Sequence, residues 1–176
     1  MGSPRLAKLC DSIELSVKDS CKDRISVSFS GGIDSTLIAF LAQKHCDVEL
    51  IAVGIPDAHD LKAARSASEL IDMELKVIEV EPKDMITEGM EMQKCLNLSS
   101  IEVEFMLPFW IAAKNSDNSI LMCGQGADEL FGGYARFRTE DAEYDLEKEV
   151  SDLVNRIPDR ENKIAKEFGL ELACPY

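Results

Sequence analysis

The sequence predicts an α/β fold in which an open parallel sheet is doubly wound, with helices on both faces. Two observations support it: β-branched runs alternate with helical patterns along the chain, and two glycine-rich loops each follow such a run. Strands joined through helices form right-handed crossovers and therefore a parallel sheet. A length of 176 residues suits one domain with a buried core, so we expect residues 1–176 to form a single Rossmann-like domain.

The first half of the chain supplies the regular part of this alternation. An amphipathic pattern predicts a helix over 5–20, and the β-branched and aromatic run 25–29 predicts a strand that ends at a glycine pair. An apolar helix, a buried strand, an alanine-rich helix and another strand are then expected over 33–45, 48–55, 61–71 and 75–80.

The second half is less regular. Helical patterns cover 83–95 and 103–113, and we expect an interruption near Pro108 because proline lacks the N–H that a helix interior needs. A short strand over 119–123 leads into loop 124–134, which is rich in glycine and acid and should open into a short helix. Beyond it we expect a charged helix over 141–157 broken by Pro158, a helix over 161–168 and a last apolar run over 170–174.

Composition narrows the classes of partner. With 19 basic and 33 acidic side chains the net charge is -14, so the surface repels polyanions and we expect no nucleic-acid partner. A small phosphate ligand is still compatible, because backbone N–H groups bind it locally. No signal-peptide pattern and no membrane-spanning apolar run are present, so we expect a cytoplasmic protein without a membrane partner.

The side chains that most often bind metals are scattered. Six cysteines occur without a C-x-x-C pair, and His45 and His59 are the two histidines, so no zinc site is expected. We expect the thiols to be reduced and buried. We further expect His59 at the surface and Trp110 in the core, rather than in contact with a substrate.

The first glycine-rich loop, Ser-Gly-Gly-Ile-Asp-Ser at 30–35, has the features of a phosphate-binding loop. In an open parallel sheet, ligands bind outside the carboxyl ends of the strands, where both loops fall. Gly31 and Gly32 permit close approaches that let backbone N–H groups point at phosphate oxygens. Ser30 and Ser35 add hydroxyl donors at the start of the helix.

Asp34 in that loop calls for a cation, because a bare carboxylate beside a triphosphate is repulsive. Mg²⁺ binds carboxylate and phosphate oxygens together, and Asp128 on the second loop is a natural second ligand. The ion would offset charge and fix the geometry for attack at phosphorus.

Each loop also has a purely structural interpretation. Asp34 and Ser35 are chemically suited to cap a helix after a tight turn, and Asp128 with Glu129 could be acids favoured at a helix N-terminus. The first loop matches neither the G-x-x-x-x-G-K-S/T phosphate loop nor the G-x-G-x-x-G fingerprint. The occurrence of both loops, in this order and at strand ends, favours a ligand site.

These residues resemble a known family. Segment 29–35 looks like the PP-loop of the ATP-pyrophosphatases, and 124–134 looks like the signature of their asparagine-synthetase branch. The similarity continues in 53–55, 60–64, 101–108, 159–160 and 169–171, and so covers nearly the whole chain from residue 22 onward. It implies the fold of the adenine nucleotide alpha hydrolases.

The resemblance implies an enzyme that splits ATP between its α and β phosphates, attaches AMP to a substrate oxygen and releases pyrophosphate. A nitrogen nucleophile then displaces AMP, so ATP, Mg²⁺ and a small carboxylate or amine substrate are implied. By position, pyrophosphate would be held by Ser30, Gly31, Gly32, Asp34 and Ser35. Asp34 and Asp128 would bind Mg²⁺, and Glu129 would complete the catalytic set by orienting loop and substrate. Phe29, Val53 and Gly124 would meet the nucleoside through backbone and apolar contacts.

The sequence departs from that family in three places. The asparagine synthetases carry an N-terminal glutaminase domain whose nucleophile is the cysteine after the initiator Met, whereas Gly2 follows Met1 here. Nitrogen would then come from free ammonia, an amine substrate or an ammonia-supplying or complementing subunit. Gln125 stands where some members have Glu, and an amide cannot act as a general base. The family also extends beyond the point matching Tyr176, with a charge-stabilising lysine in that part, so we expect either a short variant or a truncated chain.

Two other functions fit the same motifs. One is a nucleotide-binding subunit without independent catalysis, against which the presence of both Asp34 and Asp128 argues. The other is a tRNA-modifying PP-loop enzyme, against which the net charge of -14 argues. Arg136 and Arg138 could pair with phosphate or a substrate carboxylate, or lie in solvent. All of these functions are compatible with a homo-oligomer.

Overall fold

Five parallel strands form the centre of the computed structural model, which describes residues 4–131, 133 and 159–176. They are β1 (Arg24–Ser28), β2 (Asp47–Gly54), β3 (Leu75–Glu79), β4 (Ile120–Met122) and β5 (Glu171–Ala173). Their order in the sheet is β3-β2-β1-β4-β5, and each neighbouring pair is parallel. The predicted parallel sheet is confirmed.

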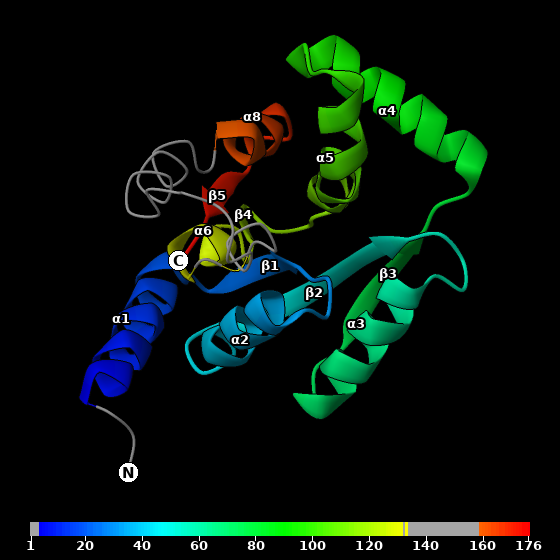
Figure 1. Cartoon of the computed structure of the whole chain (residues 1–176). Helices are drawn as coiled ribbons and strands as arrows, with labels where there is room; N and C mark the ends of the chain where they lie inside the picture. Colours follow the sequence, from blue (N-terminus) through cyan, green and yellow to red (C-terminus); the bar gives the residue numbers. More distant parts are fainter. Residues whose placement is uncertain (1–3, 132, 134–158) are drawn as a thin grey trace, which may run out of the picture.

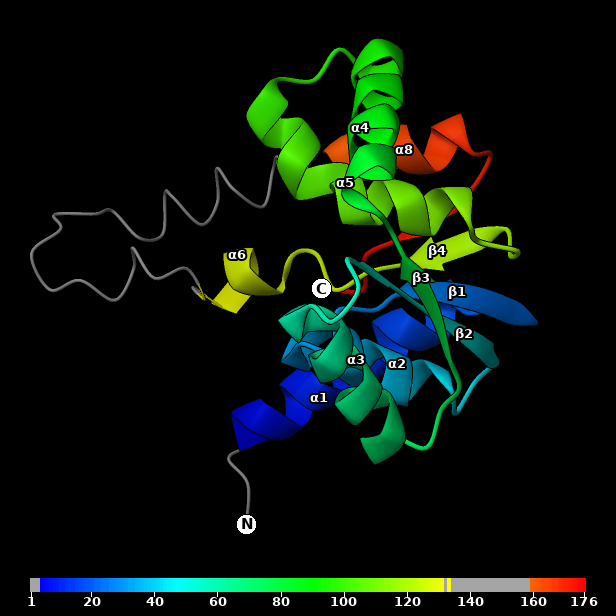
Figure 2. The same cartoon turned by 90° about the vertical axis from the view of Figure 1, so that its right-hand side faces the viewer.

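Helices cover both faces of this sheet. Their bounds are α1 (Pro4–Ser20), α2 (Ile33–Ala42), α3 (His59–Leu70), α4 (Pro82–Leu96), α5 (Ser100–Lys114), α6 (Ala127–Phe131) and α8 (Asp159–Glu167). The first three lie on one side of the sheet and α4, α5 and α8 on the other, as Figures 1 and 2 show. The doubly wound arrangement is therefore confirmed.

Each face of the sheet has its own hydrophobic core. Val27 and Leu50 pack with Ile38 of α2 on one face, while Leu121 packs with Trp110 of α5 on the other. Because both faces are covered, β4 and the second half of β2 are continuously apolar. Strand β1 alternates instead, and the hydroxyl of its buried Ser26 donates a hydrogen bond to the Glu49 carboxylate at 2.9 Å. Trp110 is 1% exposed, which confirms its predicted place in the core.

The order of the strands creates a switch point beside β1. The chain runs from β1 outward through β2 to β3, and then returns by way of α4 and α5 to β4, on the other side of β1. The connections after β1 and β4 therefore leave in opposite directions, which opens a crevice at the carboxyl ends of these two strands. Both glycine-rich loops lie at this crevice.

Helix α5 differs from its prediction. It is continuous from Ser100 to Lys114, so the expected interruption near Pro108 is wrong. A capping box fixes its start: the Glu102 backbone N–H donates to the Ser99 hydroxyl at 3.4 Å, and the Glu102 carboxylate accepts from the Ser99 backbone N–H at 2.9 Å. Pro108 and Glu104 are both exposed, so water can bond the carbonyl that a proline leaves without a partner.

Two further predictions need correction or extension. The thiols are not all buried: Cys10 and Cys95 are exposed because they lie on the outer faces of α1 and α4, and Cys123 alone is fully buried among the described cysteines. The apolar run 170–174 contains a short strand, β5, which pairs with β4. His59 begins α3 and its side chain is 94% exposed, as expected of a surface histidine.

Several predictions lie outside the described residues: the charged helix 141–157, its break at Pro158, and Arg136 and Arg138.

Of the described helices, none is by itself long and apolar enough to cross a membrane. Helices α4 and α5 together meet the length and composition, but they are bent by 107° at their junction.

Candidate functional site

The loops that follow β1 and β4 pack directly against each other. A Cβ on Gly124 would lie 3.0 Å from both the Cβ of Asp34 and the backbone nitrogen of Ser35. These distances are shorter than ordinary side-chain contacts, so a larger residue at position 124 would push the loops apart. Glycine here allows the second loop to close on the first.

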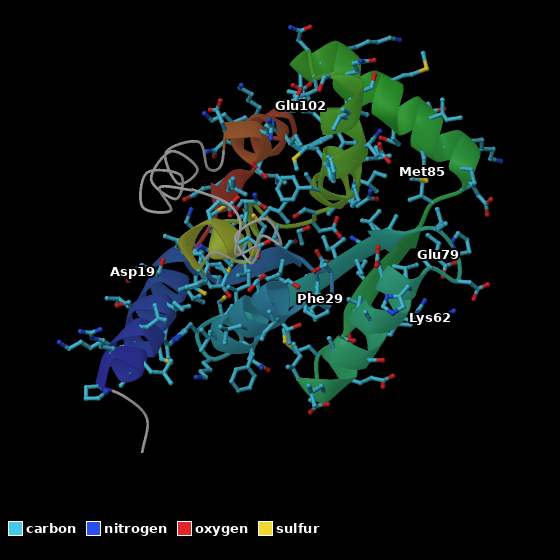
Figure 3. The ribbon with its side chains drawn as sticks, viewed as in Figure 1. Asp19, Phe29, Lys62, Glu79, Met85 and Glu102 are labelled. Atoms are coloured by element: carbon cyan, nitrogen blue, oxygen red, sulfur yellow. The ribbon has the colours of Figure 1, made fainter. Side chains whose placement is uncertain are left out.

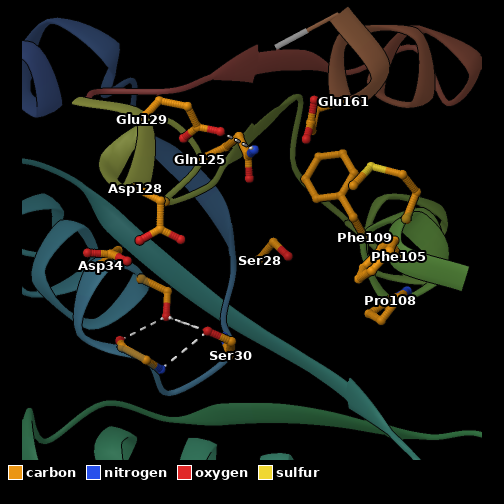
Figure 4. A pocket seen from close by; sticks show the side chains of 15 residues that line it. Ser28, Ser30, Asp34, Phe105, Pro108, Phe109, Gln125, Asp128, Glu129 and Glu161 are labelled. Carbon is orange, nitrogen blue, oxygen red and sulfur yellow. Dashed lines mark hydrogen bonds between the residues drawn. The ribbon is translucent and has the colours of Figure 1, made fainter. Parts of the chain in front are cut away.

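The first loop is held in shape by its two serines. The hydroxyls of Ser30 and Ser35 are 3.1 Å apart, and the Ser35 hydroxyl also accepts from the Ser30 backbone N–H at 3.3 Å. The Gly32 backbone N–H donates to the Ser30 hydroxyl at 3.2 Å. Figure 4 shows these bonds at the base of the crevice. Because the loop closes on itself, its shape does not depend on a ligand.

Gly31 has a different role from Gly32. Its φ is +74°, and a Cβ there would stand 2.5 Å from the backbone nitrogen of Ala64 and 2.6 Å from the backbone carbon of Ala63. Both the left-handed conformation and the close approach of α3 require glycine. Gly31 therefore faces α3, away from the crevice.

The capping interpretation of the first loop is not supported. The N-cap of α2 is Gly32, which has no side chain, and neither Asp34 nor Ser35 caps the helix. Asp34 lies instead in the first turn of α2, with its carboxylate at the crevice. An acid in this position is free to meet a ligand.

A cavity of about 370 Å³ opens between the two loops and helices α5, α6 and α8. Its lining comprises Ser28, Ser30, Gly32, Asp34, Ser35, Phe105, Met106, Pro108, Phe109, Gly124, Gln125, Gly126, Asp128, Glu129 and Glu161. Four of these described residues are carboxylates and none is a lysine or arginine. The cavity therefore favours a ligand that arrives with cations.

The two predicted metal ligands face the same space. Asp128 lies in the first turn of α6 and opposite Asp34 in Figure 4. Burial, together with the neighbouring Asp128 carboxylate, raises the pKa of Asp34 above its ordinary value. Within the described ranges no group of three His, Cys, Asp or Glu side chains is close enough to enclose a metal. Two carboxylates suit an ion that also takes phosphate oxygens and water.

The structure brings together most of the residues predicted for the site. Ser30, Gly32, Asp34, Ser35, Gly124, Asp128 and Glu129 all line the cavity. Gly31, Phe29 and Val53 do not: Phe29, labelled in Figure 3, is 2% exposed in the core, and Val53 packs against the core on the α5 face. The Phe29 side chain is therefore closed off from a nucleotide, whereas that of Val53 is only partly buried.

Sequence reasoning did not identify the wall opposite the phosphate loop. It consists of Phe105, Met106, Pro108 and Phe109 from α5 together with Glu161 from α8. In the sequence, segments 101–108 and 159–160 indicate only a resemblance to the family. No local pattern distinguishes residues that face a cavity from those that face a core, so this wall became visible only in three dimensions.

Tyr176 contacts both glycine-rich loops. Its hydroxyl donates to the Asp34 carbonyl at 3.1 Å, and its ring makes an edge contact with Phe131 at 6.1 Å between centroids. Gly126, with φ +105°, passes so close that its Cβ would be 3.3 Å from the Cβ of Tyr176. Burial, and then the Asp34 carboxylate, raise the pKa of Tyr176 to about 12.

Comparison with known proteins agrees with this geometry. The family model described as asparagine synthase matches residues 8–175. A candidate glutamine-hydrolyzing asparagine synthetase of Methanocaldococcus jannaschii is 30% identical over 165 residues, which cover 88% of this chain and 30% of that protein. The human glutamine-hydrolyzing asparagine synthetase is 27% identical over 170 residues, with 87% and 30% covered. The chain thus spans about 30% of the length of these relatives.

A solved structure shares the fold. It is a predicted subunit of tRNA methyltransferase from Methanocaldococcus jannaschii, with a TM-score of 0.53 and 17% identity over 88% of this chain and 68% of that one. At this level of identity the similarity describes the fold alone.

Proposed function

Because this chain belongs to the asparagine synthase family, we propose that it is an ATP-dependent adenylating domain that activates a carboxylate for amide formation. The observation that supports this most is the closure of the two loops, in which Gly124 lies against Asp34 and Ser35. That closure brings Asp34 and Asp128 to one side of a cavity whose base is formed by Ser30, Gly32 and Ser35.

The phosphates of ATP would lie on the first loop. Backbone N–H groups from this loop and the N-terminus of α2, with the hydroxyls of Ser30 and Ser35, would donate to phosphate oxygens. The close packing of Gly31 on α3 keeps that backbone in place. The nucleoside would lie beyond Gly124, where the buried Phe29 would contribute main-chain atoms and the partly buried Val53 its backbone and apolar side chain.

Asp34 and Asp128 would hold Mg²⁺. Burial, and then the neighbouring Asp128 carboxylate, raise the pKa of Asp34, and a bound divalent cation would favour the ionised form instead. When bound, this ion would neutralise phosphate charge and make pyrophosphate a better leaving group.

The proposed reaction has two steps. A carboxylate oxygen attacks the α phosphorus of ATP, the bond to the bridging oxygen breaks, and an acyl-adenylate and pyrophosphate form. A neutral nitrogen nucleophile then attacks the acyl carbon, AMP leaves and a proton is released. Glu129, buried at 4% exposure and 3.5 Å from the amide of Gln125, would orient the second loop and the substrate. The nitrogen would come from free ammonia, an amine or a complementing subunit.

The test is the identity of the nucleotide product. The purified chain, ATP and Mg²⁺ would be incubated with a panel of small carboxylates and amines, and nucleotides would be separated by ion-exchange chromatography. The proposal predicts AMP and pyrophosphate, lost in Asp34→Ala but kept in Asp84→Ala, an exposed acid in the first turn of α4. Formation of ADP and phosphate would contradict it, and binding without turnover for every substrate would favour the nucleotide-binding subunit.

A further inference from the structure

Glu161 is a buried acid at the end of the cavity away from the phosphate loop. It lies in the first turn of α8, is 7% exposed, and lines the cavity beside Phe109. Figure 4 shows it across the cavity from Ser30 and Asp34. It therefore lies in the same cavity as the proposed phosphate and Mg²⁺ sites, on the opposite side.

The charge of Glu161 is only partly offset: the neighbouring Arg160 favours its ionised form but makes no ion pair with it. Arg160 instead bonds the Glu102 carboxylate at 2.8 Å. Among the described residues, Glu161 makes no ion pair, and the backbone N–H that favours its ionised form is its own. Burying a carboxylate without a partner is costly, and a ligand with a positive charge would remove that cost.

The cavity as a whole points to the same kind of ligand. Its described lining contains Asp34, Asp128, Glu129 and Glu161 and no basic side chain. Mg²⁺ at Asp34 and Asp128 would leave Glu161, on the other side of the cavity, without a cation in contact. Burial is the largest cause that raises the pKa of Glu161, and Arg160 opposes this rise.

The surface next to Glu161 is apolar. Phe109, which is 8% exposed, lies beside Glu161 in Figure 4, and Met106, about one turn earlier on α5, lines the same cavity. A small inorganic cation would leave this surface without a contact, whereas a primary alkylamine has a cationic head and a hydrocarbon body. Its head would donate hydrogen bonds to the carboxylate while its methylenes cover the rings.

We propose that Glu161, with Phe109 and Met106, forms the subsite for a protonated primary alkylamine. The inference rests on the proposed function, in which an amine is one of the admissible nitrogen donors, and it specifies the class of that donor. An amine bound here would lie in the same cavity as the proposed ATP site. Before its nitrogen attacks the acyl carbon, the ammonium would give one proton to the Glu161 carboxylate, which frees the lone pair for the attack.

The experiment uses n-butylammonium as a probe and n-butanol as its uncharged analogue of equal length. Saturation-transfer difference NMR at pH 7 reports contact between the protein and the methylenes of each probe. Transfer to n-butylammonium and not to n-butanol is expected with the parent chain. Glu161→Gln should reduce the transfer at least fivefold, whereas Glu167→Gln, an exposed acid on the same helix, should leave it unchanged.

Each other outcome overturns the inference. Equal transfer to n-butanol would mean a purely apolar site, and unaltered binding in Glu161→Gln would place the cation elsewhere. If Glu161→Gln does not fold, the inference is still tested by comparing the saturation transfer to the two probes in the parent chain. A parallel titration of the parent with ATP and Mg²⁺ separates the two proposals. A parent that binds n-butylammonium but does not bind ATP would contradict the proposed function and not the amine subsite.

Discussion

The hydroxyl of Tyr176 donates a hydrogen bond to the backbone carbonyl of Asp34, with 3.1 Å between the two oxygens. This bond joins residues far apart in sequence across the two site loops. The substitution Tyr176→Phe removes this hydrogen bond and keeps the ring contact with Phe131. We therefore expect the free energy of unfolding to fall by about 1 kcal/mol. Urea denaturation at pH 7 measures it, and an unchanged midpoint would show that the bond contributes nothing.

The same tyrosine should make stability depend on pH in the alkaline range. Burial and Asp34 raise its pKa to about 12 from the ordinary 10.0, so folding favours the neutral phenol. Above pH 10 the unfolded chain loses the proton first, and the parent loses stability until pH reaches about 12. Tyr176→Phe has no phenol to lose a proton at this position. The difference in unfolding free energy between the parent and Tyr176→Phe should therefore shrink across that pH interval. A constant difference would contradict the assignment.

Gly31 and Gly169 form a matched pair for testing the loop geometry. Both have positive φ, +74° and +69°, but a Cβ on Gly31 would strike the backbone of α3, whereas nothing lies within 4 Å of one on Gly169. Gly169→Ala should therefore cost about 1 kcal/mol from the backbone alone, and Gly31→Ala at least twice as much. Chemical denaturation of both variants tests this, and equal costs would mean that α3 does not constrain the loop.

Asp128→Asn should raise the stability of the protein and weaken its binding of ATP. Burial, and then the neighbouring Asp128 carboxylate, raise the pKa of Asp34, and a raised carboxyl pKa means lost stability at neutral pH. Removing one charge should increase the melting temperature without ligand and weaken the binding of ATP in the presence of Mg²⁺. Asp84→Asn, exposed in α4, should change neither. A lower melting temperature in Asp128→Asn would contradict the repulsion.

The sequence was sufficient for the fold and for one half of the site. Alternating patterns of period near two and near 3.6 are local, and they located the elements from α1 to α4 to within a few residues. The glycines and acids of the two loops are likewise visible in short segments. Because both loops follow strands of a parallel sheet, their meeting could be anticipated.

The other half of the site depends on contacts that no short segment records. The α5 wall and Glu161 reach the cavity, and Tyr176 reaches the first loop, only because α5, α8 and β5 pack beside β4. Pro108 was expected to break a helix, but tertiary packing and the capping box at Ser99 outweighed its local effect. Phe29 is predicted to meet the nucleoside, and burial of its side chain at 2% exposure leaves only its backbone for such a contact.

The capping box of α5 gives a prediction in acid. Hydrogen bonds from Ser99, and then Arg160, lower the pKa of Glu102 to about 2 from the ordinary 4.5. A lowered pKa adds stability above pH 4.5 that is lost as pH falls toward 2. Glu102→Gln should therefore melt at a lower temperature than the parent at pH 7, and the gap should close near pH 2. A gap that persists in acid would show that the carboxylate charge is not the cause.

The most direct test of the account is calorimetric titration of the chain with ATP and Mg²⁺. The parent should bind ATP only with Mg²⁺ present, and Ser30→Ala and Asp34→Ala should each weaken binding about tenfold or more, which corresponds to ~1.4 kcal/mol. Ser12→Ala, an exposed serine of α1, should bind as the parent does. A folded parent that binds no ATP, or variants that bind it equally well, would contradict the assignment of loop 30–35 as the phosphate site.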